Sequence, residues 1–337
     1  MSEILADAGL MPAFMDYQAI GPRYQQPTEQ FRTGRHVHAY LLTGPRGIGK
    51  KTYAKYLASI LFCQGDPKPC GECTQCQLLY GGKHTAVLEI SSEGNKAISV
   101  DRIREVINLA SMHSIDGRER IIIIEPVENM TTQAQNCLLK SLEEPGTNVI
   151  YFLLSHDTSS LLDTIISRCS VVKLTPWPNQ VLERVLLQLG YPRDKVERAI
   201  ILSGGNIGEA ITIADEQPDS NQEKAVRQIL NVHTYGEAVR CTAMLKDMAS
   251  TADQILFRLE RYLQQCMMTK SGLIAPGYLL QTPWGAVIET IPIEDLTDLT
   301  DQVFKARKMK MSNVNWQSNI DQLILKILEA KSKWQKS

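Results

Sequence analysis

The chain has 337 residues, 43% of them hydrophobic, so it is long enough for two or three ordinary domains with cores of their own. Its 36 basic and 37 acidic residues give a formal net charge of −1, which excludes a global electrostatic attraction for nucleic acid. No apolar run is long enough to span a bilayer, and the first residues lack the basic-then-apolar layout of a signal peptide. We therefore expect a cytoplasmic protein with no membrane segment.

Five apolar runs in the first half predict buried strands. Near-continuous Ile, Val and Leu without polar alternation is typical of a parallel sheet covered on both faces. The runs are residues 38–43, 86–90, 120–124, 149–154 and 171–174. Helical patterns alternate with them at 51–62, 100–112, 131–142 and 159–167. This alternation predicts a doubly wound α/β domain over residues 1–177.

A glycine-rich segment links the first predicted strand to the first predicted helix. Gly44, Gly47 and Gly49 permit positive φ and close backbone approach, so consecutive N–H groups and the helix N-terminus can cradle an anion. Lys50 adds a positive charge for the β- and γ-phosphates. The strand–loop–helix context predicts a phosphate loop for ATP rather than an ordinary glycine turn.

Two positions depart from a working phosphate site. Lys51 stands where a Ser or Thr hydroxyl would bind Mg²⁺, and Thr52 comes one residue late, which on a helix turns its side chain by about 100°. Glu125 ends a buried strand, where a carboxylate holds Mg²⁺ in such ATPases, although a solvated strand-end residue fits equally. Pro126, which follows it, has no side chain able to act as a general base. ATP binding with Mg²⁺ therefore stays open, and hydrolysis is not expected.

Four of the eight cysteines lie close together in the chain. Cys63, Cys70, Cys73 and Cys76 form the pattern C-x6-C-x2-C-x2-C, and four thiolates satisfy tetrahedral Zn²⁺ with no open position. The spacing therefore predicts a structural zinc site, with an iron–sulfur cluster or free thiols as the alternatives. His84 is expected at the surface and not as a ligand. The scattered cysteines are expected to act as small buried apolar residues: Cys137, Cys169, Cys241 and Cys266.

The second half contains only helical patterns. Short helices predicted within residues 178–220 indicate a small lid, and longer amphipathic patterns at 252–268, 293–308 and 316–334 predict a helical domain over 221–337. One local basic cluster, residues 305–310, is a candidate for contact with DNA phosphates. A basic helix face more often faces solvent.

Arg168 follows the predicted helix 159–167. An arginine at a helix end can project outward and stabilise a γ-phosphate bound by a neighbouring subunit. Most surface arginines are instead solvated or paired with carboxylates, so position alone does not decide between these roles.

Together, these segments resemble the bacterial clamp-loader branch of the AAA+ family. The stretch NCLLKSLEEP at 136–145 is similar to the N-A-L-L-K-T-L-E-E-P helix of that family, and residues 167–169 match its S-R-C motif. The resemblance extends over residues 20–215, and beyond them the chain is similar only in being helical. The segments that carry it are 36–52, 63–76, 121–146, 151–174 and 203–211.

The resemblance implies a subunit of the ring that loads the β sliding clamp of DNA polymerase III on primed DNA during replication. Active subunits carry G-K-T/S, an Asp-Glu pair and a nucleotide-sensing Arg in the lid, where this chain has Lys51, Glu125 with Pro126, and Gly208. These losses favour a catalytically degenerate subunit that lends Arg168 to an adjacent ATPase. Its expected partners are tau/gamma and delta subunits, reached through a collar at 221–337. The alternatives are an active tau/gamma-type ATPase and a zinc-containing DNA-binding scaffold.

Overall fold

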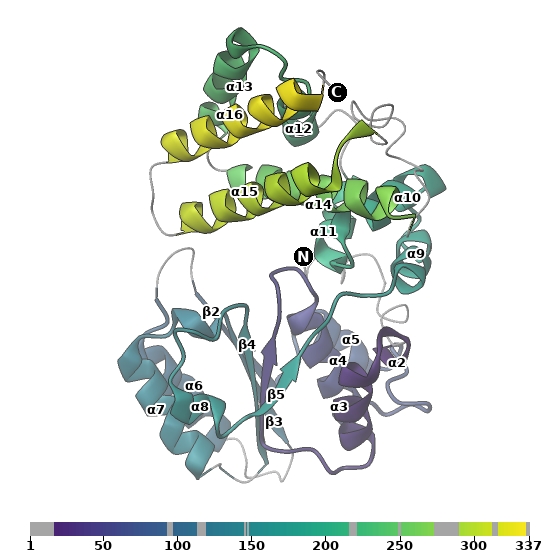
Figure 1. The fold of residues 1–337 in the computed structure, drawn as a ribbon. Coiled ribbons are helices and arrows are strands. Elements are labelled where there is room, and N and C mark those ends of the chain that lie inside the picture. Colours follow the sequence, from purple (N-terminus) through teal and green to yellow (C-terminus); the bar gives the residue numbers. More distant parts are fainter. Residues whose placement is uncertain are drawn as a thin grey trace. The chain divides into compact units, whose positions relative to one another are not determined.

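The computed structural model describes residues 17–92, 97–112, 119–144, 146, 148–215, 221–248, 251–272, 290–311 and 316–334. The chain divides into two compact units (Figure 1). The first unit contains Met1–Tyr191 together with Gly205–Gly208, and the second contains Pro192–Gly204 together with Glu209–Ser337.

A parallel sheet forms the centre of the first unit. Its strands lie in the order β2-β3-β4-β1-β5, and every adjacent pair is parallel. Each strand matches a predicted apolar run to within one residue at either end. They are β1 (Ala39–Thr43), β2 (Val87–Ser91), β3 (Arg120–Glu125), β4 (Val149–Ser155) and β5 (Ser170–Lys173). Because all of them run the same way, the segments that follow them meet at one edge of the sheet.

Helices cover both faces of this sheet (Figure 1). On one side lie α2 (Tyr17–Ile20), α3 (Pro22–Arg32), α4 (Lys50–Phe62) and α5 (Thr74–Tyr80). On the other lie α6 (Val100–Met112), α7 (Thr132–Glu143) and the short α8 (Asp163–Ile166). The predicted doubly wound α/β domain is therefore confirmed. The Ile and Leu side chains of β3 and β4 are buried because both faces are covered.

Two local predictions were wrong. The helix predicted over 159–167 is only one turn long in α8, because polar groups of Asp157 bond Ser155 and Ser159 and hold the preceding residues in a loop. The predicted burial of β5 was also wrong. This strand pairs only with β1 and lies at the edge of the sheet, so Val171 is 51% exposed.

A cluster of buried tyrosines joins α2, α3 and α4, and sequence periodicity gave no indication of it. Tyr17 contacts the rings of Tyr24, Tyr53 and Tyr56 at centroid distances of 4.6–5.8 Å, as well as that of Trp177. The Tyr24 hydroxyl donates to the carbonyl of Thr175 at 3.1 Å. This cluster fixes the segment that leaves β5 against the phosphate-loop helix, since buried aromatic contacts and a satisfied hydroxyl stabilise one geometry.

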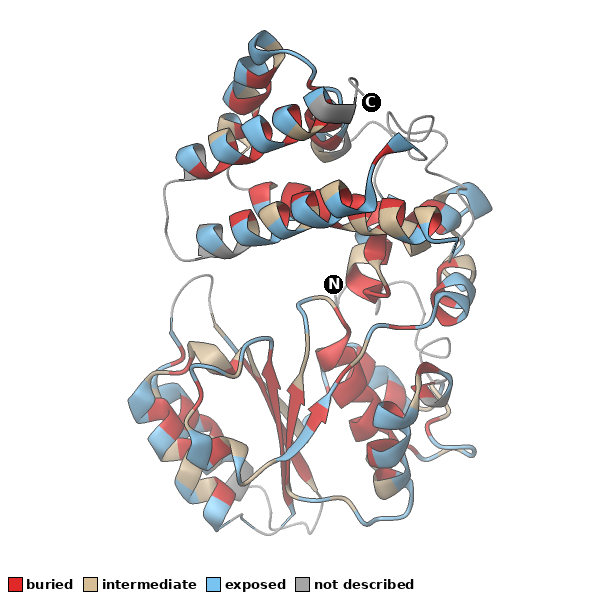
Figure 2. Ribbon diagram, viewed as in Figure 1, coloured by how far each residue is buried: buried red, intermediate tan, exposed pale blue. Residues whose placement is uncertain are grey.

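The second unit is helical. Its elements are α10 (Arg193–Ser203), most of α11 (Ile207–Asp215), α12 (Asn221–Leu230), α13 (Tyr235–Asp247), α14 (Ala252–Lys270), α15 (Ile293–Met311) and α16 (Trp316–Trp334). Helix α14 packs against α10, α12 and α15, and α16 packs against α13 and α15. The buried faces of α12, α13, α14, α15 and α16 enclose one apolar core (Figure 2). The amphipathic patterns at 252–268, 293–308 and 316–334 are thus helices, as predicted.

The boundary between the units falls inside the predicted lid. Helix α9 (Asn179–Gln188) lies in the first unit, and α10 lies in the second. The division into three domains at 177 and 220 stays a prediction. Among the described residues, no helix combines the length and the apolar character that a membrane crossing requires.

Candidate functional site

The glycine-rich segment lies between β1 and α4, at the edge of the sheet where Glu125 ends β3. Lys50 is 6% exposed, and its Nζ donates to the carbonyl oxygens of Gly44 at 2.8 Å and Pro45 at 3.0 Å. Burial lowers the pKa of Lys50, while the negative charges of Glu125 and Glu128 act in the opposite direction. The lysine therefore binds its own loop and is not turned toward a phosphate.

A second segment of the same unit is seated on this loop. Asn206 Nδ2 donates to the carbonyl of Arg46 at 2.8 Å, and the N–H of Gly208 donates to the carbonyl of Gly47 at 2.9 Å. Gly47 has a φ of +85°, and a Cβ there would lie 2.7 Å from Asn206 Oδ1. Only glycine fits this contact without strain. These contacts use carbonyl oxygens of the loop and fix its backbone, whereas a phosphate would be held by the N–H groups of the loop.

Lys51 has a partner that explains its presence. Its Nζ lies 2.6 Å from Glu89 Oε2, and Lys55 Nζ lies 2.8 Å from the other carboxylate oxygen. Burial alone would raise the pKa of Glu89, but the hydrogen bonds and charges of the two lysines outweigh burial and lower it. Thr52 is buried. Lys51 and Lys55 are therefore both engaged by one carboxylate, and the role of Thr52 toward Mg²⁺ stays a prediction.

Glu128 and His156 form an ion pair at the same edge that sequence reasoning missed. Glu128 Oε1 lies 2.5 Å from His156 Nδ1 and accepts the backbone N–H of His156 at 3.0 Å. The side chain of Glu128 is 8% exposed. Its hydrogen bonds to His156 join the segment after β3 to the residue after β4. The available signal was an acidic residue three positions beyond Glu125 and a histidine directly after an apolar strand.

We expect Glu128→Gln to destabilise the first unit by about 1–3 kcal/mol at neutral pH, since a buried charged acceptor loses its bonds. Burial alone would raise the pKa of Glu128, but hydrogen bonding to His156 outweighs it, and the pKa falls to about 2. A carboxyl group whose pKa is lower in the folded state stabilises the fold at pH values above its ordinary pKa of 4.5. This contribution is lost as the pH falls toward 2. Denaturant unfolding should therefore show a smaller difference between variant and wild type at pH 3.5 than at pH 5.5. A difference that grows as the pH falls would contradict this assignment.

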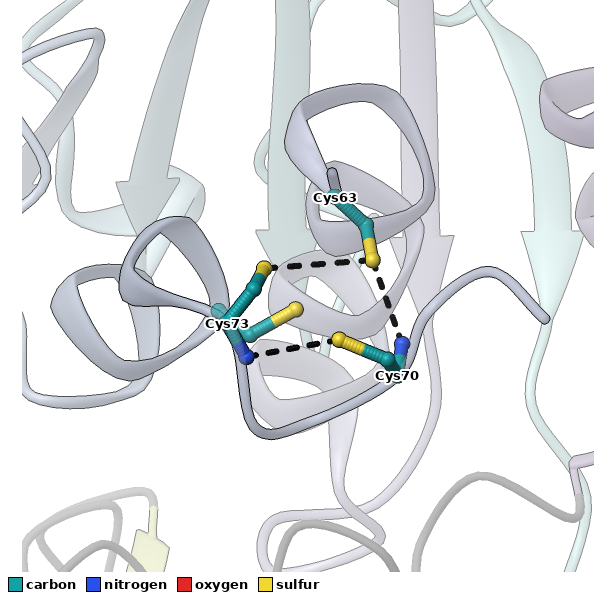
Figure 3. A group of neighbouring side chains, drawn as sticks. Cys63, Cys70 and Cys73 are labelled. Carbon is teal, nitrogen blue, oxygen red and sulfur yellow. Dashed lines mark hydrogen bonds between the residues drawn. The ribbon is translucent and has the colours of Figure 1, made fainter. Parts of the chain in front are cut away.

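The four predicted zinc ligands come together in one cluster (Figure 3). The sulfurs of Cys63, Cys70, Cys73 and Cys76 all lie within 4.8 Å of one another. Four sulfurs at about 2.3 Å from one Zn²⁺ in a tetrahedron would be about 3.8 Å apart, so small movements complete such a site. The donor set and its spacing therefore fit a metal ion held by four thiolates.

The surrounding backbone also favours thiolates. The N–H groups of Gly65 and Cys70 donate to Cys63 Sγ at 3.3 and 3.2 Å, and the N–H of Cys73 donates to Cys70 Sγ at 3.3 Å. The N–H of Cys73 is the main reason that the pKa of Cys70 is lowered. Helix α4 spans 13 residues between Lys50 and the cluster, which places the cluster about 20 Å from the phosphate loop. A metal there serves structure and cannot act at the loop.

His84 and the other cysteines lie outside this cluster. The expected surface position of His84 was wrong, because it is 8% exposed, stacks on Phe62 and accepts the N–H of Ala86. Cys241 and Cys266 are buried as predicted, whereas Cys137 and Cys169 are only partly buried. Burial raises the pKa of the thiols of Cys169, Cys241 and Cys266 and keeps them unreactive.

Arg168 follows α8 and lies on the surface, 35% exposed. Its Nη2 lies 2.6 Å from Glu143 Oε1, and its Nη1 donates to the carbonyl of Thr164 at 3.0 Å. The side chain is therefore ordered by its surroundings and still accessible to a ligand held by another molecule.

The basic cluster 305–310 is less free than its sequence indicates. Arg307 lies 2.6 Å from Glu260 and 3.3 Å from Asp253, and its guanidinium stacks on the ring of Phe257 at 4.9 Å. Lys305 is exposed, while the side chains of Lys308 and Lys310 lie outside the described residues. The guanidinium of Arg307 is thus engaged by side chains of the second unit.

Comparison with known proteins gives one family model and several relatives that agree with it. Residues 22–178 match the family model for the DNA polymerase III delta subunit. The delta-prime subunit of DNA polymerase III from Pseudomonas aeruginosa is 39% identical over 178 residues, covering 51% of this chain and 54% of that protein. The gamma subunit from Buchnera aphidicola is 38% identical over 143 residues, covering 42% of this chain and 39% of that protein.

A solved structure of a gamma-subunit-related protein from Thermotoga maritima is 18% identical to this chain, with a TM-score of 0.48 over 92% of this chain and all of the other. The chain spans about half the length of the delta-prime relative that it matches.

Proposed function

We propose that this chain is a catalytically degenerate, delta-prime-type clamp-loader subunit, from its match over residues 22–178 and its likeness to delta-prime subunits of bacterial DNA polymerase III. It takes part in loading the β sliding clamp on primed DNA during replication. It does so without hydrolysing ATP itself. The observation that carries the proposal is the contrast between Lys51, paired with Glu89 where a Mg²⁺ ligand would stand, and the ordered, accessible Arg168.

The nucleotide side supports the loss of hydrolysis. Lys50 bonds carbonyls of its own loop, Lys51 is paired with Glu89 where a Mg²⁺ ligand would stand, and Pro126 replaces the general base. To reach a phosphate, Lys50 would have to leave the carbonyl oxygens of Gly44 and Pro45. We therefore propose that ATP and Mg²⁺ have no catalytic role on this chain.

Arg168 supports a role in trans. We propose that it acts as an arginine finger on ATP held by a neighbouring tau/gamma subunit, where its positive charge stabilises the transferred phosphoryl group. This places the chain in a hetero-oligomer with tau/gamma and delta subunits in the cytoplasm. The β clamp and primed DNA are reached through the complex. The helical residues 221–337 serve as its collar, after a lid at 178–220.

The four-cysteine cluster is proposed to hold one structural Zn²⁺. Its thiolates would tie the C-terminus of α4 to the start of α5, because Cys63 caps α4 and Cys73 caps α5. The metal supplies cross-linking and no open coordination position.

The competing function is an active tau/gamma-type ATPase, favoured by the likeness to the Buchnera gamma subunit. It requires Lys50 to leave its loop carbonyls. A DNA-binding scaffold has weaker support, because Arg307 is engaged by carboxylates.

Reconstituted clamp loading tests the proposal. A mixture of tau/gamma and delta subunits, a fluorescent β clamp and primed circular DNA should retain clamp on DNA only when this chain is added. Equal loading with and without the chain would contradict a clamp-loader role.

A further inference from the structure

Helix α7 contacts α8 along one face, and its sequence places polar groups at both ends of that contact. Gln135, Leu138 and Leu142 recur at helical spacing and are all buried. Glu143 is the last residue of α7 and is exposed, to one side of this buried face. The buried face and the exposed end of α7 therefore both offer polar groups to the segment around α8.

At the first end, Gln135 holds the segment that enters α8. Its Oε1 accepts the N–H of Leu162 at 3.0 Å, and its Nε2 donates to the carbonyl of Ser160 at 3.2 Å. The centre is filled by Ile165 of α8, which is fully buried in the same apolar cluster as Leu138. A one-turn helix has little stability of its own, so α8 keeps its place through these contacts.

At the second end, Glu143 meets Arg168. The guanidinium uses Nη2 for Glu143, and Nη1 for Thr164 and, at 3.5 Å, Ser167. An arginine side chain has five N–H donors, and among the described residues no contact of Nε is found. Donors therefore remain for an incoming phosphate while the side chain is held in one orientation.

We infer that Glu143 is a positioning residue that holds the Arg168 guanidinium ready for the phosphate of a neighbouring subunit. This inference rests on the proposed arginine-finger role. A long side chain fixed before the neighbour arrives loses less rotamer freedom on binding, and small misplacements of a reacting partner slow chemistry. Glu143 does not contact the neighbour's nucleotide in this account and acts only through Arg168.

The test is single-turnover ATP hydrolysis by a reconstituted tau/gamma and delta complex that contains this chain as wild type, Glu143→Gln, Glu143→Asp or Arg168→Ala. We expect Glu143→Gln to lower the rate of hydrolysis at the site that receives Arg168 by about 1.5- to fivefold, which is the range of an exposed ion pair. Glu143→Asp should recover part of the rate. Glu144→Gln, which removes the neighbouring charge, serves as the matched control and should behave as wild type.

The possible outcomes distinguish the positioning role of Glu143 from the arginine-finger role of Arg168. If Arg168→Ala lowers kcat and adding Glu143→Gln to it lowers kcat no further, Glu143 acts through Arg168. If Arg168→Ala lowers kcat while Glu143→Gln leaves or raises it, the positioning role is overturned and the finger role stands. If Arg168→Ala itself has no effect, the finger role fails first.

Discussion

Arg168→Ala should reduce ATP turnover at the neighbouring site of the assembled complex by about 10³-fold, the lower end of what arginine fingers contribute. The loss should appear in kcat, because the guanidinium meets charge that develops on the phosphate during transfer. In single-turnover measurements of phosphate release, one fraction of the bound ATP should be hydrolysed more slowly. The other sites should keep their rates, since they do not receive this residue.

Two variants make this result specific. Arg168→Lys should recover only part of the rate, because lysine lacks the planar, forked donors of arginine. Arg104→Ala removes an exposed arginine of α6 that pairs with Asp101 at 3.5 Å, and it should leave turnover unchanged. Equal turnover by the wild type and Arg168→Ala would show that Arg168 is an ordinary surface residue.

Cys76→Ser should release the metal and destabilise the first unit by on the order of 4 kcal/mol, as loss of a structural metal does. The melting temperature should then fall by about 10 °C. Cys76 is buried near the start of α5, so an exposed side chain cannot reach its position and take the place of the lost thiolate. Atomic emission should find one zinc per wild-type chain and none in the variant.

A chelator should lower the melting temperature of the wild type to that of Cys76→Ser and leave the variant unchanged. Cys137→Ser changes a partly buried cysteine of α7 outside the cluster and should retain its zinc. Iron in the wild type, together with visible absorption, would show that the cysteines hold an iron–sulfur cluster and not zinc. A wild-type protein without any bound metal would contradict the metal site.

The local sequence pattern was sufficient to predict the strands of the sheet and the cysteine cluster. Strands such as β3 and β4 were predicted closely because buried parallel strands require continuous apolar residues. The cysteines were predicted because a two-residue spacing brings two thiolates to one ion. Both features are decided by residues near one another in the chain.

Long-range contacts were beyond sequence reasoning. Asn206 reaches Arg46 across 160 positions, and His156 reaches Glu128 across 28. The length of α8 was overestimated because polar side chains before it compete for the backbone. The motif matches therefore located the phosphate loop, but only its tertiary contacts show that Lys50 is turned back onto it.

ATP hydrolysis by the isolated chain, measured beside the reconstituted complex, decides whether this chain is itself a motor subunit. The chain alone should show no turnover above background, while the complex that contains it hydrolyses ATP. Turnover by the isolated chain at a rate comparable to that of the complex would mean that Lys50 leaves its loop carbonyls. The protein would then be a motor subunit and not a donor of Arg168.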